Sequence, residues 1–255
     1  MSVAGGPKLV TDGLLLNLDA SSPKSIVSGA AFWNDLSQNN HGFNVNVAAL
    51  QRPDSPPSSV PYMDFGGSYG AAKRVVGGSL VDVSKTSAAT ICLFSRPNQS
   101  NGVWRTLLRA KEGVGGGDHN VIIEQGAEAI GKYMNSDGHN AGFMSSSYNV
   151  TSIPLSLTVW NYFCFTITTE GSPYWAFYLN SNQSTAVANI TNLDGGFYSS
   201  FCCIGGYQNA TDIDTGPTNS SQYWGQISNL LYYNRVLTEP ERVQNHNALR
   251  SRFGL

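Results

Sequence analysis

The stretch GQISNLLYYNRVLTEPERVQNHNALRSRFGL, Gly225–Leu255, decides the fold of this chain. It begins with Ile227–Tyr233, in which both alternating faces carry bulky side chains, as in a central strand that is covered on each side. Thr238 and, three residues later, Glu241 have the spacing of a capping box, and Pro240 suits the first turn of a helix. The stretch therefore predicts a buried strand followed by a short C-terminal helix.

The predicted helix carries a small apolar stripe and has a basic end. The stripe consists of Val243, Asn247, Ala248 and Leu249. Arg250 and Arg252 suit the negative end of the helix dipole. We expect the helix to cover an end of the domain by packing within the chain. The alternative is that it forms an interface with a neighbouring subunit through Arg250, Arg252 and Phe253.

A strand that is covered on both sides needs neighbouring strands, and the best candidate lies at the other end of the chain. GLLLNLDA, Gly13–Ala20, places three leucines on one face and alternates them with Leu15, Asn17 and Asp19. Pairing of these two terminal strands would complete one sheet and hold both chain ends together.

Four motifs together resemble a known family. They are GLLLNLDA (Gly13–Ala20), FWNDLS (Phe32–Ser37), YMDF (Tyr62–Phe65) and the stretch Gly225–Leu255. The chain resembles, over nearly its whole length, the concanavalin A-like, laminin-G-like domains found in bacteriophage and other viral structural proteins. The resemblance implies an all-β fold, an antiparallel two-sheet jelly-roll sandwich of the concanavalin A-like lectin/glucanase type with one short C-terminal helix.

The middle of the chain reads as a run of short strands separated by turn residues, which favours a sandwich. Two aromatic-rich strands are expected to pair across the turn at Gly171–Pro173. The residues expected to face one another are Phe163, Phe165 and Ile167 on one strand and Trp175, Phe177 and Leu179 on the next.

Length and composition indicate a single domain. A chain of 255 residues is an ordinary size for one β-sandwich, which we place at residues 13–255, after an N-terminal arm at residues 1–12. Charged residues make up 13%, about half of the usual ~25%, and the net charge is −2. A surface rich in Ser, Asn, Thr and Gln suits contacts with sugars or protein subunits, although a loop-rich sandwich explains it equally well. No basic patch indicates nucleic acid.

The sequence contains no secretory leader pattern and no apolar run long enough to span a membrane. We therefore expect synthesis in a host cytoplasm, and the resemblance to viral structural proteins implies localisation to a virion. The four cysteines, Cys92, Cys164, Cys202 and Cys203, lie in apolar, strand-like runs. We interpret them as reduced, buried side chains. One buried disulfide that involves Cys92 or Cys164 remains the alternative, and their spacing does not match a zinc site.

The sequence offers little that suits catalysis. Glycosidases with a concanavalin-like fold need two carboxylates across the sugar bond, and their Glu-x-Asp-x-x-Glu strand motif is absent. Glu124 and Glu128 come nearest, but solvated carboxylates are the better interpretation. None of the four histidines lies in a nucleophile-elbow context; they are His41, His119, His139 and His246. We expect no enzymatic activity.

One loop combines the residue types that bind calcium and sugars. Laminin-G-like domains commonly hold one calcium at a loop rim, so the resemblance implies a calcium site in the loop at Gly206–Gln222. Its hard oxygen donors would be Asp212, Asp214 and Asn209, supported by Asn219. Turn formation explains these residues equally well. No cofactor is expected to be required.

Aromatic residues flank the same loop. Tyr207, Tyr223 and Trp224 are candidates to stack on a sugar ring, and packing at the start of a strand is the alternative. We expect a virion structural protein, a capsid decoration or a tail- or fibre-associated subunit, that contacts other virion proteins as a homo-oligomer and also binds surface glycans. The alternative is a carbohydrate-binding module outside a virion, and a glycoside hydrolase is the least favoured.

Overall fold

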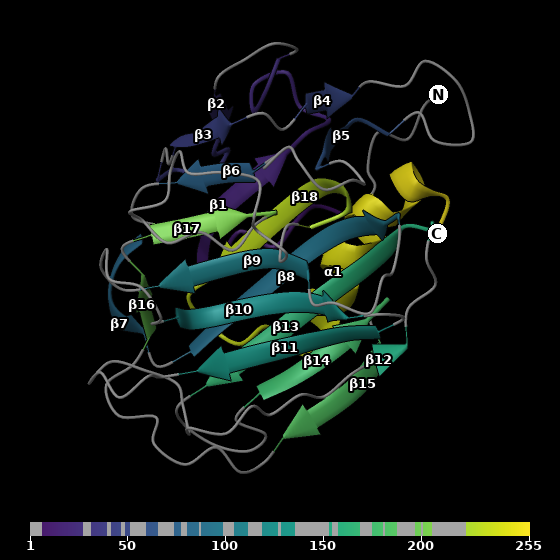
Figure 1. Cartoon of the computed structure of the whole chain (residues 1–255). Coiled ribbons are helices and arrows are strands. Elements are labelled where there is room, and N and C mark those ends of the chain that lie inside the picture. Colours follow the sequence, from purple (N-terminus) through teal and green to yellow (C-terminus); the bar gives the residue numbers. More distant parts are fainter. Residues whose placement is uncertain are drawn as a thin grey trace.

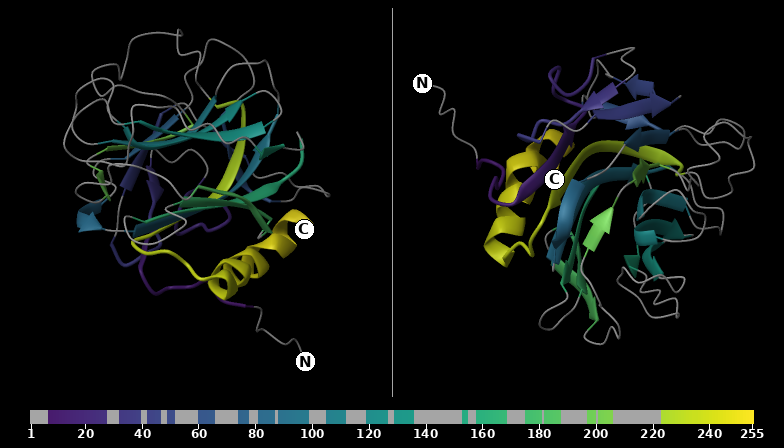
Figure 2. Two further views of the ribbon diagram at one scale, coloured as in Figure 1. Left: turned by 90° about the horizontal axis from the view of Figure 1, so that it is seen from below. Right: turned by 90° about the vertical axis from the view of Figure 1, so that its left-hand side faces the viewer.

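The computed structural model describes residues 7–27, 32–39, 42–46, 49–51, 60–65, 74–77, 81–86, 88–98, 105–111, 119–126, 129–135, 153–154, 158–168, 175–180, 182–187, 197–199, 201–205 and 223–255. Two eight-stranded antiparallel sheets form a sandwich, and helix α1 (Glu239–Leu249) lies outside it (Figures 1 and 2). A short 3₁₀ helix, Arg250–Phe253, follows α1. The predicted all-β, two-sheet sandwich with a short C-terminal helix is confirmed.

Sheet A has the strand order β15-β14-β13-β8-β18-β5-β4, with β1 added beside β18. Its strands are β1 (Leu14–Asp19), β4 (Ala49–Gln51), β5 (Tyr62–Asp64), β8 (Ala88–Pro97), β13 (Asn161–Thr168), β14 (Trp175–Leu179), β15 (Asn182–Val187) and β18 (Gly225–Tyr233).

Sheet B has the strand order β12-β11-β10-β9-β17-β6-β3-β2. Its strands are β2 (Phe32–Asn34), β3 (Gly42–Asn46), β6 (Arg74–Gly77), β9 (Arg105–Lys111), β10 (His119–Gly126), β11 (Ala129–Asn135), β12 (Ile153–Pro154) and β17 (Phe201–Ile204). A separate two-stranded sheet pairs β7 (Val81–Thr86) with β16 (Phe197–Ser199).

Strand β18 is the centre of sheet A, and all of its residues are buried. On one side it pairs with β8 along its whole length, and on the other with β5 and then β1. Leu18 of β1 lies opposite Leu230 of β18. The predicted pairing of the two terminal strands is therefore confirmed, and it brings both ends of the chain to one sheet.

The predicted register of the aromatic hairpin is also confirmed. In the antiparallel pair of β13 and β14, the facing residues are Phe163 and Leu179, Phe165 and Phe177, and Ile167 and Trp175. Strand β13 also pairs with β8, so that β8 lies between β13 and β18. These three strands form the central frame of sheet A.

Helix α1 covers the outer face of sheet A, a different place from the expected end of the sandwich (Figure 2). The side chains that it turns inward are Arg242, Asn245, His246 and Leu249. The predicted apolar stripe is therefore confirmed for Leu249 and the partly buried Ala248, and it is wrong for Val243 and Asn247. The inward face is polar because its side chains have specific partners on sheet A and on the N-terminal segment. Among the residues described, no helix is long and apolar enough to cross a membrane.

The N-terminal segment Lys8–Asp12 packs against this helix. The Val10 N–H donates to Asn245 Oδ1 over 2.9 Å, and the Gln244 side chain donates to the Lys8 carbonyl over 2.7 Å. Val10 itself is buried. The segment was expected to belong to an arm over residues 1–12, but from Lys8 onward it is held by contacts within the chain.

Candidate functional site

The loop at residues 206–222, which carries most of the predicted binding residues, lies outside the described residues, but both of its flanks are described. Gly205 follows β17 of sheet B, and Tyr223 precedes β18 of sheet A. The Tyr223 N–H donates to the Gly205 carbonyl over 3.0 Å, and the Gly205 N–H donates to the Leu107 carbonyl over 2.8 Å. The two ends of the loop are therefore adjacent, and the hydrogen bond between them links the end of a strand in sheet B to the start of a strand in sheet A.

Tyr223 anchors one flank of the loop. Its ring has no exposed surface and packs edge-on against Phe65, with the ring centroids 6.2 Å apart. Its hydroxyl makes a short hydrogen bond with the Ser95 hydroxyl of β8. Burial raises the pKa of the Tyr223 hydroxyl, and the bond to Ser95 opposes this increase. Because neither face of the ring is exposed, Tyr223 is a packing residue here and offers no surface to a sugar.

Trp224 has the same role. Only 5% of its surface is exposed, and its carbonyl accepts the Asn98 N–H over 3.1 Å. The stacking role predicted for Tyr223 and Trp224 thus has no support in their positions, whereas the alternative of packing at the start of a strand accounts for both. An aromatic residue beside a polar loop fits either role, so the sequence pattern did not distinguish them.

Two glycines let the flanks come this close. Gly205 has a φ of +79°, and a Cβ atom there would lie 2.0 Å from the Phe65 ring. A Cβ atom at Gly225 would lie 2.6 Å from both the Arg96 carbonyl and the Tyr223 hydroxyl. Only glycine allows this packing, since Cβ atoms essentially never approach other heavy atoms within 3.0 Å.

Next to these flanks lies a group of residues that we call the loop rim: Arg96, Asn98, Thr158, Val159 and Gln226. The Arg96 Nε–H donates to the Thr158 carbonyl over 2.8 Å, and its Nη1 lies 3.5 Å from Gln226 Oε1. The Thr158 N–H donates to the Pro97 carbonyl over 2.7 Å. Val159 is 46% exposed. The loop rim thus combines hydrogen-bonding groups with an exposed aliphatic side chain.

The remaining predicted ligand residues fall in the loop itself. Tyr207, Asn209, Asp212 and Asp214 lie outside the described residues, so the calcium site and the sugar contact of Tyr207 stay predictions. In the part of the chain that the structure describes, no group of three or more His, Cys, Asp or Glu residues is placed to hold a metal ion. Asp and Asn oxygens in the loop have the donor chemistry that calcium prefers.

Several described carboxylates are engaged in structural contacts. Asp19 Oδ2 lies 2.8 Å from Arg252, and Asp12 Oδ2 lies 2.9 Å from Arg235. Asp35 accepts the N–H groups of Asn17 and Ser37, each over 2.8 Å. These carboxylates hold the chain ends and a turn in place.

The residues considered for catalysis occupy different parts of the chain. Glu124 and His119 belong to β10, whereas Glu128, His41 and His139 lie outside the described residues. His246 is buried in helix α1, where its ring stacks on Tyr162 with centroids 5.2 Å apart. Burial and the neighbouring Arg250 lower the pKa of His246.

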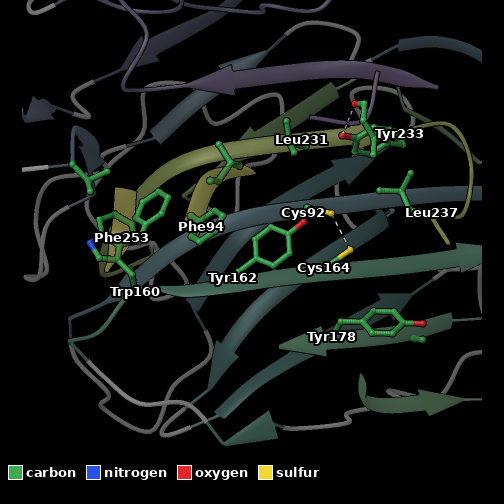
Figure 3. Close-up of a cluster of buried hydrophobic side chains, with 14 residues drawn as sticks. Cys92, Phe94, Trp160, Tyr162, Cys164, Tyr178, Leu231, Tyr233, Leu237 and Phe253 are labelled. Carbon is green, nitrogen blue, oxygen red and sulfur yellow. Dashed lines mark hydrogen bonds between the residues drawn. The ribbon is translucent and has the colours of Figure 1, made fainter. Parts of the chain in front are cut away.

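Of the three residues predicted as an alternative subunit interface, Phe253 is buried, whereas Arg250 and Arg252 are exposed. The Phe253 ring stacks on Phe94 with the centroids 4.0 Å apart and an interplanar angle of 6° (Figure 3). Arg252 binds Asp19, and Arg250 is exposed. Packing within the chain, the expected role of this segment, therefore occupies Phe253 and Arg252.

A polar cluster under helix α1 was missed by the sequence reasoning. Asn245 accepts the Val10 N–H and donates to the Tyr233 hydroxyl over 3.0 Å. The Arg242 guanidinium lies 3.7 Å from the centre of the Tyr178 ring and donates to the Leu237 carbonyl over 2.5 Å. The spacing of Arg242, Asn245 and Leu249 is that of one helix face and could have revealed the cluster. The polarity of Arg242 and Asn245 concealed this pattern.

Comparison with known proteins supports the fold. No family model matches the chain, and no curated protein matches its sequence. The binding domain of botulinum neurotoxin serotype G matches with a TM-score of 0.65 and 13% identity, over 91% of this chain and 50% of that one. The binding domain of botulinum neurotoxin DC, in complex with rat synaptotagmin II, matches with a TM-score of 0.66 and 13% identity, over 94% and 52%.

An enzyme also shares the fold. Trypanosoma rangeli sialidase, in complex with the inhibitor DANA, matches with a TM-score of 0.64 and 14% identity, over 97% of this chain and 34% of that one. The chain spans about half the length of the neurotoxin binding domains and a third of the sialidase. At these identities the likeness concerns the fold alone: this chain is an antiparallel two-sheet β-sandwich with a short C-terminal helix.

Proposed function

We propose that this chain is a non-enzymatic structural subunit of a virion, a capsid decoration or a tail- or fibre-associated protein. It acts through contacts with other virion proteins as a homo-oligomer, and it binds surface glycans at the end of the sandwich that carries the loop at residues 206–222. A calcium ion held by Asp212, Asp214 and Asn209 is proposed as an optional support for that loop.

The observation that carries this proposal is the way the loop is attached. Its flanks, Gly205 and Tyr223, are hydrogen-bonded to each other, and each also bonds to a strand of a different sheet: Gly205 to Leu107 of β9 and Tyr223 to Ser95 of β8. A polar loop on a rigid frame is the common arrangement of a binding site, because the frame fixes the loop ends while the loop side chains meet the ligand. Beside it, the loop rim adds the Arg96 guanidinium and the exposed Val159, which suit a polar ligand with one apolar face.

The similar structures are consistent with a binding role. Cell entry of botulinum neurotoxin type C depends on interaction with two ganglioside molecules, and the neurotoxin DC binding domain forms a complex with rat synaptotagmin II. Those partners belong to those proteins. They support a glycan or a protein as the class of ligand to test on this fold.

Structural use of the carboxylates supports a non-enzymatic role. Glycoside hydrolysis needs two carboxylates that face one sugar bond. Asp12, Asp19 and Glu241 are instead each paired with an arginine that fastens a chain terminus. A fluorogenic sialoside or glucoside that is hydrolysed by the purified chain, and not by a Glu124→Gln variant, would overturn this part of the proposal.

The virion role is tested on purified particles of a virus that encodes this chain. Quantitative mass spectrometry should find the chain in stoichiometric copies relative to the major capsid protein. Its presence in the infected-cell lysate together with its absence from purified particles would overturn the proposal.

Glycan binding is tested separately, on a glycan array with and without EDTA. The chain should bind at least one glycan, and Tyr207→Ala should weaken that binding at least tenfold. Asp212→Asn should weaken it only when calcium is present, and Asp12→Asn serves as the matched control outside the loop. No binding by the natural chain, with or without calcium, would remove the glycan from the proposal and leave the protein contacts.

A carbohydrate-binding module outside a virion is the second candidate, favoured by the likeness to the ganglioside-binding neurotoxin domain. The two candidates differ in the particle measurement, because such a module would bind glycans and be absent from purified particles.

A further inference from the structure

Two cysteine thiols face each other in the middle of sheet A. Cys92 of β8 and Cys164 of β13 are directly opposite in the antiparallel register, and neither has any exposed surface. Both are free, and their sulfur atoms lie 2.9 Å apart (Figure 3). Cys92 and Cys164 are 72 positions apart in the sequence.

This placement meets the requirements of a disulfide. Directly opposite residues of an antiparallel pair have Cα atoms about 4.5–5.5 Å apart, within the range of about 4.4–6.8 Å that disulfides span. A bond of about 2.05 Å requires the sulfurs to approach by less than about 1 Å. By contrast, Cys202 and Cys203 of β17 lie opposite Ala110 and Arg109 of β9.

We propose that Cys92 and Cys164 form a modification site, a cross-strand dithiol that converts reversibly to a disulfide and that helix α1 covers. In the forward reaction two S–H bonds break and one S–S bond forms. The two electrons and two protons pass to a two-electron oxidant such as diamide, whose N=N bond becomes a hydrazine. A dithiol reductant reverses the reaction. The inference does not depend on the proposed virion or glycan function.

Helix α1 and the residues after it form the cover. Leu249 and Phe253 belong to the same buried cluster as the two thiols, and the hydroxyl of Tyr162 points toward Cys92 (Figure 3). The helix also contacts Tyr162 of β13, because the His246 ring stacks on the Tyr162 ring. We therefore expect an oxidant to reach the buried sulfurs when the helix moves away from sheet A.

The electrostatic environment makes the site slow to react while it is covered. Burial, together with the adjacent Cys92, raises the pKa of the Cys164 thiol. Because the thiolate is the species that attacks, a raised pKa slows oxidation. The disulfide then forms at a rate that the opening of the helix controls, and it joins β8 to β13 in the central frame of sheet A. In an oxidising environment this bond would prevent the two strands from separating.

The test is disulfide mapping on the full chain after treatment with diamide, followed by alkylation of the remaining thiols. Digestion with trypsin and a Glu-specific protease separates the sites. Trypsin releases Cys92 in the peptide Thr86–Arg105, and cleavage after Glu170 separates Cys164 from Cys202 and Cys203. We expect a linked Cys92–Cys164 peptide that dithiothreitol removes and that Cys92→Ala abolishes.

The role of the cover is tested by the rate. Leu249→Ala, which removes an apolar contact of the helix, should accelerate formation of the linked peptide at least tenfold. Val243→Ala, on the half-buried side of the same helix, is the matched control and should leave the rate within a factor of two. The absence of the linked peptide in Leu249→Ala, or links only to Cys202 or Cys203, would overturn the site. Equal rates in the natural chain and Leu249→Ala would overturn the cover.

Discussion

The Val10 N–H donates to Asn245 Oδ1 over 2.9 Å and so joins two residues that are 235 positions apart. Asn245 also donates to the Tyr233 hydroxyl, which in turn donates to the Val10 carbonyl over 3.0 Å. One fully buried amide side chain therefore connects the N-terminal segment, the central strand β18 and helix α1.

Replacing this amide should destabilise the fold. Asn245→Ala orphans the buried Val10 N–H, which costs about 1–3 kcal/mol, and it removes the hydrogen bond that the Tyr233 hydroxyl accepts, which is worth about 0.5–1.5 kcal/mol. We expect the free energy of unfolding, measured by urea denaturation, to fall by about 2–4 kcal/mol. Asn247→Ala, at a half-buried position of the same helix, should change it by less than about 0.5 kcal/mol. Equal losses in the two variants would contradict the connecting role of Asn245.

Acidification should loosen helix α1 through His246. Burial is the main cause of its lowered pKa, and Arg250 adds to it, so the folded chain binds a proton less readily than the unfolded chain, whose pKa is about 6.5. The resulting stability is complete above pH ~6.5 and is lost as the pH falls through the folded pKa, by at most about 1.4 kcal/mol per pH unit. Protonation would also add a third positive charge between Arg242 and Arg250.

The measurement is urea denaturation at pH 5, 6, 7 and 8 for the natural chain and for His246→Gln. Because the two proteins differ only at residue 246, the difference between the two curves isolates His246. We expect a shallower pH dependence in the variant below pH ~6.5. Parallel curves would contradict the prediction.

The ion pair at the start of the helix should persist in mild acid. Glu241 accepts hydrogen bonds from Arg235 over 2.6 and 2.8 Å and from the Thr238 N–H over 2.8 Å. The bond from Arg235 is the main cause that lowers the pKa of Glu241 to about 2. Its contribution to stability is therefore complete above the unfolded pKa of about 4.3 and is lost as the pH falls through about 2.

Glu241→Gln should lower the free energy of unfolding at pH 7 by about 1 kcal/mol, since it weakens both the cap and the ion pair. Glu239 is the exposed first residue of the same helix, so Glu239→Gln should lower the free energy of unfolding by less than about 0.5 kcal/mol. Urea denaturation of both variants at pH 7 and pH 3 gives the comparison, and a loss that is as large for Glu239→Gln would contradict the specific role of Glu241.

Gly205 should tolerate no side chain. Gly205→Ala would incur both the cost of a positive φ, about 1–2 kcal/mol, and a clash with the Phe65 ring, about 1–3 kcal/mol. Gly254 has a similar φ of +71° but open space around it, so Gly254→Ala measures the backbone cost alone. We expect Gly205→Ala to be the more destabilising of the two in thermal or urea unfolding, and equal losses would contradict the predicted clash.

The sequence predicted the sheets better than it predicted the helix packing. The pairing of β1 with β18 and of β13 with β14 followed from apolar alternation, because a strand that is buried on both faces must lie between other strands. Helix α1 was different, because Arg242, Asn245 and His246 would ordinarily face water. Their partners, such as Val10 and Tyr178, come from distant parts of the chain, and periodicity within the helix carries no information about them.

The candidate site was predictable only as a segment. A polar loop between two strands is visible in the sequence, but the roles of its flanking rings depend on contacts across the sandwich. Tyr223 is buried because Phe65 and Ser95, which are far away in sequence, enclose it.

The proposed role in a particle is tested most directly by an electron-microscopy reconstruction of a virion whose genome encodes this chain. We expect density for this two-sheet sandwich at symmetry-related positions on the capsid, tail or fibre, with the end that carries the loop at residues 206–222 directed outward. A complete reconstruction in which other proteins account for all of the density would contradict the proposed role.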